Sequence, residues 1–93
     1  MKTYNLFLGL NRSNGSKIST QDFLRFLKIV DDFFPSYTIQ NAVGSWKGQK
    51  EDTKILSVST DSKKDVIRLA EEYKNIFSQD AVGITEAPAM EFV

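Results

Sequence analysis

The chain has 93 residues, of which 41% are hydrophobic, so it suits one domain spanning residues 1–93. Twelve basic residues balance twelve acidic residues, which disfavours a dedicated nucleic-acid binder, because such proteins usually carry a basic excess. The absence of Cys excludes disulfides and fits a reducing compartment. No stretch resembles a signal peptide or approaches the roughly 20 apolar residues of a membrane span, so we expect a cytoplasmic protein without membrane contact.

A first strand is predicted at Tyr4-Asn5-Leu6-Phe7-Leu8-Gly9-Leu10. Apolar residues alternate here, so as a strand they would share one face: Tyr4, Leu6, Leu8 and Leu10. Phe7 would point to the opposite face, between Asn5 and Gly9. That aromatic side chain is either covered by another segment or available for binding.

A helix is predicted after the loop Asn11–Lys17, in which Asn14-Gly15 is a strong turn signal. Ser19, with Asp22 three residues later, fits a helix N-terminus of the capping-box type. Pro35 ends the helix, because its ring disfavours helical geometry at the preceding residue. The apolar residues recur at spacings of three and four: Phe23, Phe26, Leu27, Val30, Phe33 and Phe34.

The central part of the chain predicts a hairpin of two strands, Tyr37–Trp46 and Lys54–Thr60. The polar segment Lys47–Thr53 is predicted to connect the two strands, with Gly48 available for a turn. A second helix follows, capped by Asp61 or Ser62. Its predicted apolar face is broad: Val66, Ile67, Leu69, Ala70, Tyr73, Ile76 and Phe77.

The chain ends with a predicted fourth strand at Ala81–Thr85. Glu86-Ala87-Pro88 is expected to break it, and Ala89–Val93 either resumes the strand or pairs separately. The element order βαββαβ indicates an α+β, ferredoxin-like fold with two helices on one face of a four-stranded antiparallel sheet. Right-handed crossovers place the first and third strands at the centre.

The other sheet face would then be bare. It would carry Phe7, Ile55 and Trp46, and would need a cover from the C-terminal segment, a protein partner or a second copy of the chain. Trp46, the only tryptophan, is either a contact anchor or a residue that closes one end of the sheet. Leu6-Phe7-Leu8-Gly9-Leu10-Asn11 also resembles the first RNA-contacting motif of RNA-recognition domains, but the third strand lacks the partner aromatics.

Two polar positions are further binding candidates. Arg12 and Lys17 precede a helix N-terminus and could hold an anion there, although a solvated loop is the plainer interpretation. Gln79 either caps carbonyl groups at the end of the second helix or takes part in binding. With neither His nor Cys, the chain lacks the commonest catalytic base, thiol nucleophile and transition-metal ligands, so we expect no enzyme, no cofactor and no metal.

The chain as a whole resembles a family of short bacterial and phage proteins, the domain of unknown function family 3574. The resemblance rests on short motifs along most of the chain: Leu8-Gly9, Phe26-Leu27, Phe34-Pro35, Thr38, Gly44-Ser45-Trp46-Lys47-Gly48, Tyr73, Phe77, Gln79 and Val82. It implies the ferredoxin-like fold and draws attention to Trp46 and Gln79. The family has no established activity.

The sequence therefore favours a small non-enzymatic binding or regulatory domain that contacts a protein partner or a second copy of itself. An inhibitor carried by a phage is one form of this prediction. The alternative is a protein that binds a small ligand, such as a nucleotide or metabolite. Single-stranded RNA binding comes third.

Overall fold

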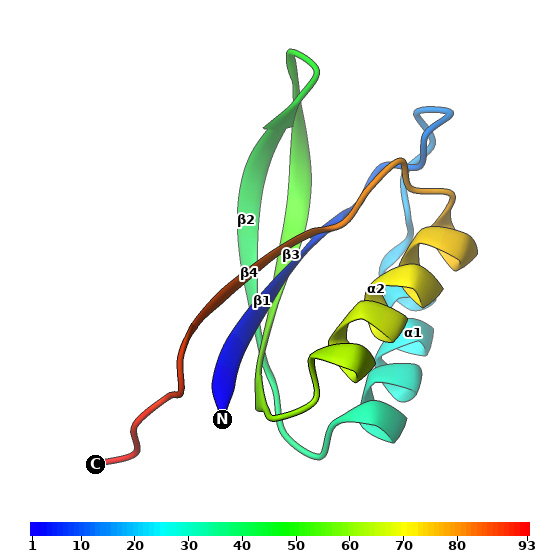
Figure 1. The fold of residues 1–93 in the computed structure, drawn as a ribbon. Helices are drawn as coiled ribbons and strands as arrows, with labels where there is room; N and C mark the ends of the chain where they lie inside the picture. The colour runs from blue at the N-terminus through cyan, green and yellow to red at the C-terminus, as the bar shows by residue number, and fades with distance from the viewer.

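The computed structural model describes the backbone of all 93 residues and every side chain except that of Trp46. The elements follow the predicted order: β1 (Lys2–Gly9), α1 (Thr20–Phe33), β2 (Thr38–Trp46), β3 (Gln49–Thr60), α2 (Lys63–Phe77) and β4 (Gly83–Pro88). The antiparallel sheet has the order β2-β3-β1-β4, with the first and third strands central. Both helices lie on the same side of this sheet (Figure 1). The predicted α+β, ferredoxin-like fold is confirmed.

The core lies between the helices and one face of the sheet. On β1, Tyr4, Leu6 and Leu8 are buried there, as their alternation predicts. The two helices meet through aromatic rings, with Phe26 and Tyr73 at 4.9 Å between centroids in an edge-to-face arrangement. The predicted apolar face of α2 was too broad, because Ile67 and Ile76 are 41% and 45% exposed.

The helix ends follow local side-chain chemistry. The Ser19 hydroxyl accepts a hydrogen bond from the backbone N–H of Asp22 at 3.1 Å, so the predicted cap of α1 is confirmed. At α2 the cap is Ser62, which accepts from the Asp65 N–H at 3.3 Å. Phe34 leaves α1 with extended backbone just before the proline.

The hairpin between β2 and β3 is longer than predicted. Its turn consists of Lys47 and Gly48 alone, with φ of 50° and 79°, which is the positive-φ geometry of a tight two-residue turn. The polar residues 49–53 therefore belong to β3 and not to a loop. A polar sequence is compatible with a strand here because this end of the hairpin projects beyond the helices and is open to solvent (Figure 1).

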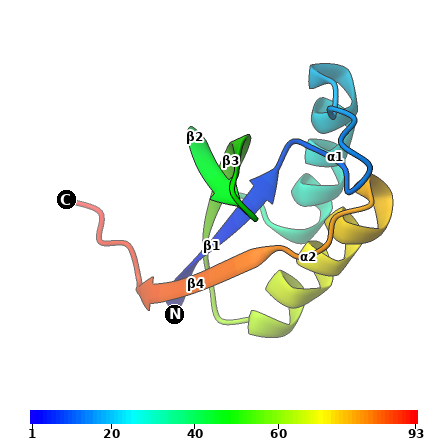
Figure 2. The ribbon, with the colours of Figure 1, turned by 90° about the horizontal axis from the view of Figure 1, so that it is seen from above.

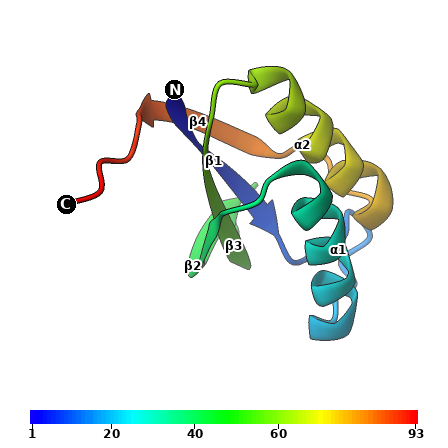
Figure 3. The same cartoon turned by 90° about the horizontal axis from the view of Figure 1, so that it is seen from below.

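The C-terminal prediction was wrong in two respects. Glu86-Ala87-Pro88 does not break β4, whose pairing with β1 continues to Pro88 opposite Lys2. Proline is tolerated because β4 is an edge strand and its outer side has no partner strand. Residues 89–93 form no strand and continue beyond the end of β4 (Figures 2 and 3), where Met90 and Phe92 line a hollow together with Ser57 and Ser59 at one end of the bare face.

The sheet face opposite the helices is bare, as predicted, but it is largely polar. Phe7, 38% exposed, pairs with Ile55 on β3 and with Gly83 on β4. Toward the N-terminus of β1 the neighbouring side chains bond to one another: Asn5 accepts from Ser57 at 2.5 Å and donates to Thr85 at 3.3 Å. Such a face is hydrated without penalty, so the prediction that it needs a cover loses its main physical reason.

Candidate functional site

A hollow of about 340 Å³ lies on the bare sheet face, where three strands carry glycine. Gly9 on β1, Gly44 on β2 and Gly83, the first residue of β4, all line it. Three of the five glycines in the chain thus remove side chains from one region of the sheet. Glycine inside a strand weakens it, and commonly marks a place where another group or a ligand approaches the backbone.

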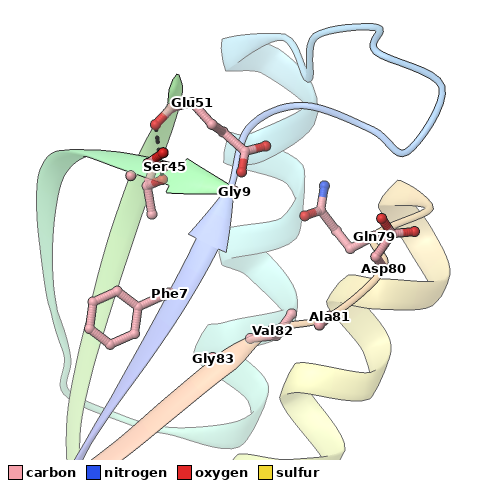
Figure 4. A pocket seen from close by; sticks show the side chains of 11 residues that line it. Phe7, Gly9, Ser45, Glu51, Gln79, Asp80, Ala81, Val82 and Gly83 are labelled. Atoms are coloured by element: carbon pink, nitrogen blue, oxygen red, sulfur yellow. Dashed lines mark hydrogen bonds between the residues drawn. The ribbon is translucent and has the colours of Figure 1, made fainter. Parts of the chain in front are cut away.

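The carboxylate of Glu51 lies directly over Gly9. A methyl group built on Gly9 would come within 2.6 Å of Glu51 Oε1, so only glycine leaves room for the carboxylate. Glu51 Oε2 accepts a hydrogen bond from the backbone N–H of Asn11 at 2.9 Å. Figure 4 shows this side chain turned toward the end of β1, with the Phe7 ring further along the same face. The hollow therefore combines an aromatic ring with a positioned negative charge.

The backbone beneath the hollow is held from the helix side. The buried Tyr73 hydroxyl donates to the carbonyl oxygen of Gly9 at 2.5 Å, and the Gln79 amide donates to that of Asn11 at 2.5 Å. Burial, reinforced by the Glu51 carboxylate, raises the pKa of Tyr73, so the hydroxyl remains a donor at neutral pH. Together with Glu51, these groups fix both ends of the segment 9–11.

A second hollow of about 310 Å³ adjoins the first, and Glu51 and Asp80 line both. It lies between the loop that follows β1 and the tip of the hairpin, and it has a more polar lining. Asp80 forms an ion pair with Lys47 at 3.6 Å. This pair links the tip of the hairpin to the connection between α2 and β4.

The predicted anion contact takes a different form in the structure. Arg12 lines the second hollow, but its guanidinium donates to the Lys17 carbonyl at 2.9 Å and pairs with Asp22 at 3.6 Å. It also lies over the Phe77 ring, 5.9 Å from the centroid. Arg12 therefore holds its own loop against α1 and α2, while Lys17 lines neither hollow.

The structure brings together some of the predicted binding residues and not others. Phe7 and Gln79 both line the first hollow. Gln79 does not cap α2 with its side chain, as its plainer interpretation held, but reaches across to the loop after β1. Ile55 lies beside Phe7 in the sheet without lining the hollow. The prediction for the Trp46 side chain lies outside the described residues.

Sequence reasoning missed Glu51 and Asp80, and with them Gly44 and Gly83. Glu51 looked like one member of a solvated acidic pair with Asp52, and Asp80 was noted only as a neighbour of Gln79. The available signal was the glycines themselves, since glycine within otherwise regular strand patterns indicates a close approach. Only the sheet register reveals that these glycines meet on one face.

The site offers carboxylates, hydroxyls and amides as its chemical groups. Among the described residues, no group of three or more Asp, Glu, His or Cys could hold a metal ion. Within that same part of the chain, no helix is long and apolar enough to cross a membrane. The chemistry available in the hollow is therefore that of its aromatic ring and its carboxylates.

Fold and site together define a small α+β domain with a hollow on its open sheet face. The family model described as "Protein of unknown function (DUF3574)" matches residues 3–92, and the chain belongs to that family. No curated protein matches the sequence. The resemblance identified from the sequence is thus confirmed.

Among solved structures, one described as a phage SAM lyase in the apo state has the same fold. Its TM-score is 0.62 at 16% sequence identity, and the match covers 99% of this chain and 92% of that chain. At this identity the likeness establishes the fold. It nevertheless contradicts the prediction that the chain is not an enzyme, because an enzyme uses this fold over nearly its whole length. The lack of His and Cys removed two kinds of catalytic group, but carboxylates and hydroxyls remain.

Proposed function

We propose that this protein is a lyase that acts on a small sulfonium nucleoside of the S-adenosylmethionine (SAM) type, bound in the hollow on the sheet face. The observation that carries the proposal is the placement of the Glu51 carboxylate over Gly9, in the same hollow as the half-exposed Phe7 ring. The fold shared with a phage SAM lyase supports the choice of ligand.

The hollow has the chemistry that such a ligand needs. A volume of about 340 Å³ lies at the lower end of the range for small-molecule sites, about 300–1,000 Å³. The Phe7 ring offers a flat apolar face on which a purine can stack, and an aromatic face also attracts a cation. Glu51 supplies negative charge for the sulfonium, which carries a permanent positive charge, and Asp80, although paired with Lys47, lies beside it in the same hollow.

The positive charge on a sulfonium makes the sulfur a good leaving group, so the protein needs no additional group to activate it. When a carbon–sulfur bond breaks, the bonding electrons stay on sulfur and a neutral thioether leaves. A lyase adds no water, so the carbon fragment either loses a proton to a base or closes on a nucleophile of its own. The protein's part is to orient the ligand and exclude water, and a carboxylate such as Glu51 can accept the proton in the first case.

The experiment is incubation of the purified protein with SAM, followed by mass spectrometry of the products. We expect loss of SAM and release of a thioether such as 5′-methylthioadenosine. In water enriched in ¹⁸O the primary products should carry no label, because a lyase does not add water. No loss of SAM, or a primary product labelled by the solvent, would contradict the proposal.

Two neighbouring acidic residues provide a matched pair of variants. Glu51→Gln removes the carboxylate in the hollow, whereas Asp52→Asn makes the same chemical change one residue along β3, on an exposed side chain that lines neither hollow. We expect at least a tenfold loss of kcat/KM for Glu51→Gln, equivalent to about 1.4 kcal/mol, and little change for Asp52→Asn. Equal effects would show that general charge, and not the site, is responsible.

We also propose, as a second candidate role, that the protein associates with a protein partner or a second copy, in the cytoplasm. The exposed apolar side chains of the C-terminal segment favour this, since Phe92 is 87% exposed and Met90 is 48% exposed. Measuring the mass in solution with and without residues 89–93 tests the self-association. A monomer at high micromolar concentration in both cases would exclude a homodimer.

A further inference from the structure

The second hollow differs from the first in its charge. Lys47 and Lys50 both line it, together with Arg12, whereas no basic residue lines the first hollow. Glu51 and Asp80 stand where the two hollows adjoin, because both line each of them. Moving from the first hollow to the second, a ligand would meet an aromatic ring, then carboxylates, then ammonium groups.

Two of the three basic residues have structural partners. Arg12 bonds to the Lys17 carbonyl and to Asp22, and Lys47 pairs with Asp80 at 3.6 Å. Lys50 is exposed on β3, and no carboxylate among the described residues lies within ion-pair distance of it. Its ammonium group is therefore the cation in this hollow that a ligand can engage without breaking an existing ion pair.

We propose that the second hollow takes the amino-acid end of the ligand and that Lys50 binds its carboxylate. The proposal rests on the proposed function, since it assumes that the first hollow holds the nucleoside. The ligand must then contain three groups: an adenine-type ring that binds in the first hollow, a cationic centre that lies at Glu51 and Asp80, and a carboxylate that binds Lys50. The protein should discriminate against nucleosides that lack the carboxylate.

The experiment compares two thioethers that the protein cannot cleave, because neither contains a sulfonium. S-adenosylhomocysteine carries the carboxylate, and its decarboxylated analogue does not. Their dissociation constants are measured by titration calorimetry with wild-type protein, Lys50→Gln and Lys64→Gln. Lys64→Gln is the matched control, because it removes the same charge from an exposed position on α2 that lines neither hollow.

We expect wild type and Lys64→Gln to bind S-adenosylhomocysteine about fivefold more tightly than the decarboxylated analogue, as for a partly exposed ion pair. Lys50→Gln should remove this preference while leaving the affinity for the analogue unchanged. Equal affinities in wild type, or a preference that survives in Lys50→Gln, would overturn the inference and leave the proposed function standing. If the protein neither binds nor cleaves SAM, the proposed function fails, and this inference fails with it.

Discussion

Replacing Gly9 by alanine tests whether the glycine exists to admit the Glu51 carboxylate. The added methyl group would lie 2.6 Å from Glu51 Oε1, so the carboxylate must withdraw by roughly 0.8 Å to reach ordinary contact at 3.4 Å. That movement removes its 2.9 Å hydrogen bond from the Asn11 N–H. Loss of this charge-assisted hydrogen bond lowers the free energy of unfolding by about 1.5 kcal/mol. Alanine in a strand raises it by about 0.5 kcal/mol relative to glycine.

The expected net decrease in the free energy of unfolding is therefore about 1 kcal/mol, or about 4–8 °C in Tm for a chain of this size. Urea unfolding of Gly9→Ala, Glu51→Ala and the double variant measures it as a thermodynamic cycle. In the Glu51→Ala background the methyl group meets no carboxylate, so Gly9→Ala should stabilise the protein by about 0.5 kcal/mol. An equal loss of stability in both backgrounds would refute the reasoning, because the strain would then lie in the backbone.

Three further predictions concern single interactions. Tyr73→Phe leaves the Gly9 carbonyl without its donor and should lower the free energy of unfolding by about 1–2 kcal/mol in urea. Because the pKa of Tyr73 is raised in the fold, its contribution should be complete below pH 10 and decline above it, so the variant should show a flatter alkaline stability profile. Lys2 holds the pKa of Glu86 below its usual range, so Lys2→Gln should raise the Glu86 pKa in an NMR titration. Gly48→Ala should destabilise the hairpin by about 1 kcal/mol, because φ is 79° there, and a neutral result would show that the turn adapts.

Local patterns were enough to predict the elements that bury one face. The alternation in β1 and the Ser19 cap each depend on a few neighbouring residues, and both are found in the structure. Residues 49–53 could not be assigned in the same way. All five residues are polar, including the buried Thr53, so this part of the strand has no hydrophobic alternation and its sequence resembles a loop.

The site depends on pairings between distant residues, which local patterns do not contain. Tyr73 bonds to Gly9 across 64 positions, and Gln79 to Asn11 across 68. The role of Glu51 is visible only from the strand register, which places this residue near the end of β1. The prediction that the chain is not an enzyme, which the fold shared with a phage SAM lyase contradicts, was wrong for a related reason: it surveyed residue types and could not include the fold.

The hollow on the sheet face has walls from the beginning, the middle and the end of the chain: Phe7 and Gly9, then Gly44, Ser45, Glu51 and Thr53, and last residues 79–83. No fragment that lacks one of these segments contains the site, and contacts so distant in sequence form slowly during folding. β4 is a six-residue edge strand with five exposed residues, so it should detach before the rest of the sheet. Local opening of β4 would remove one wall of the site while the core between β1, β3 and the helices stays intact. We therefore expect the site to be lost by opening of its last strand before the domain as a whole unfolds.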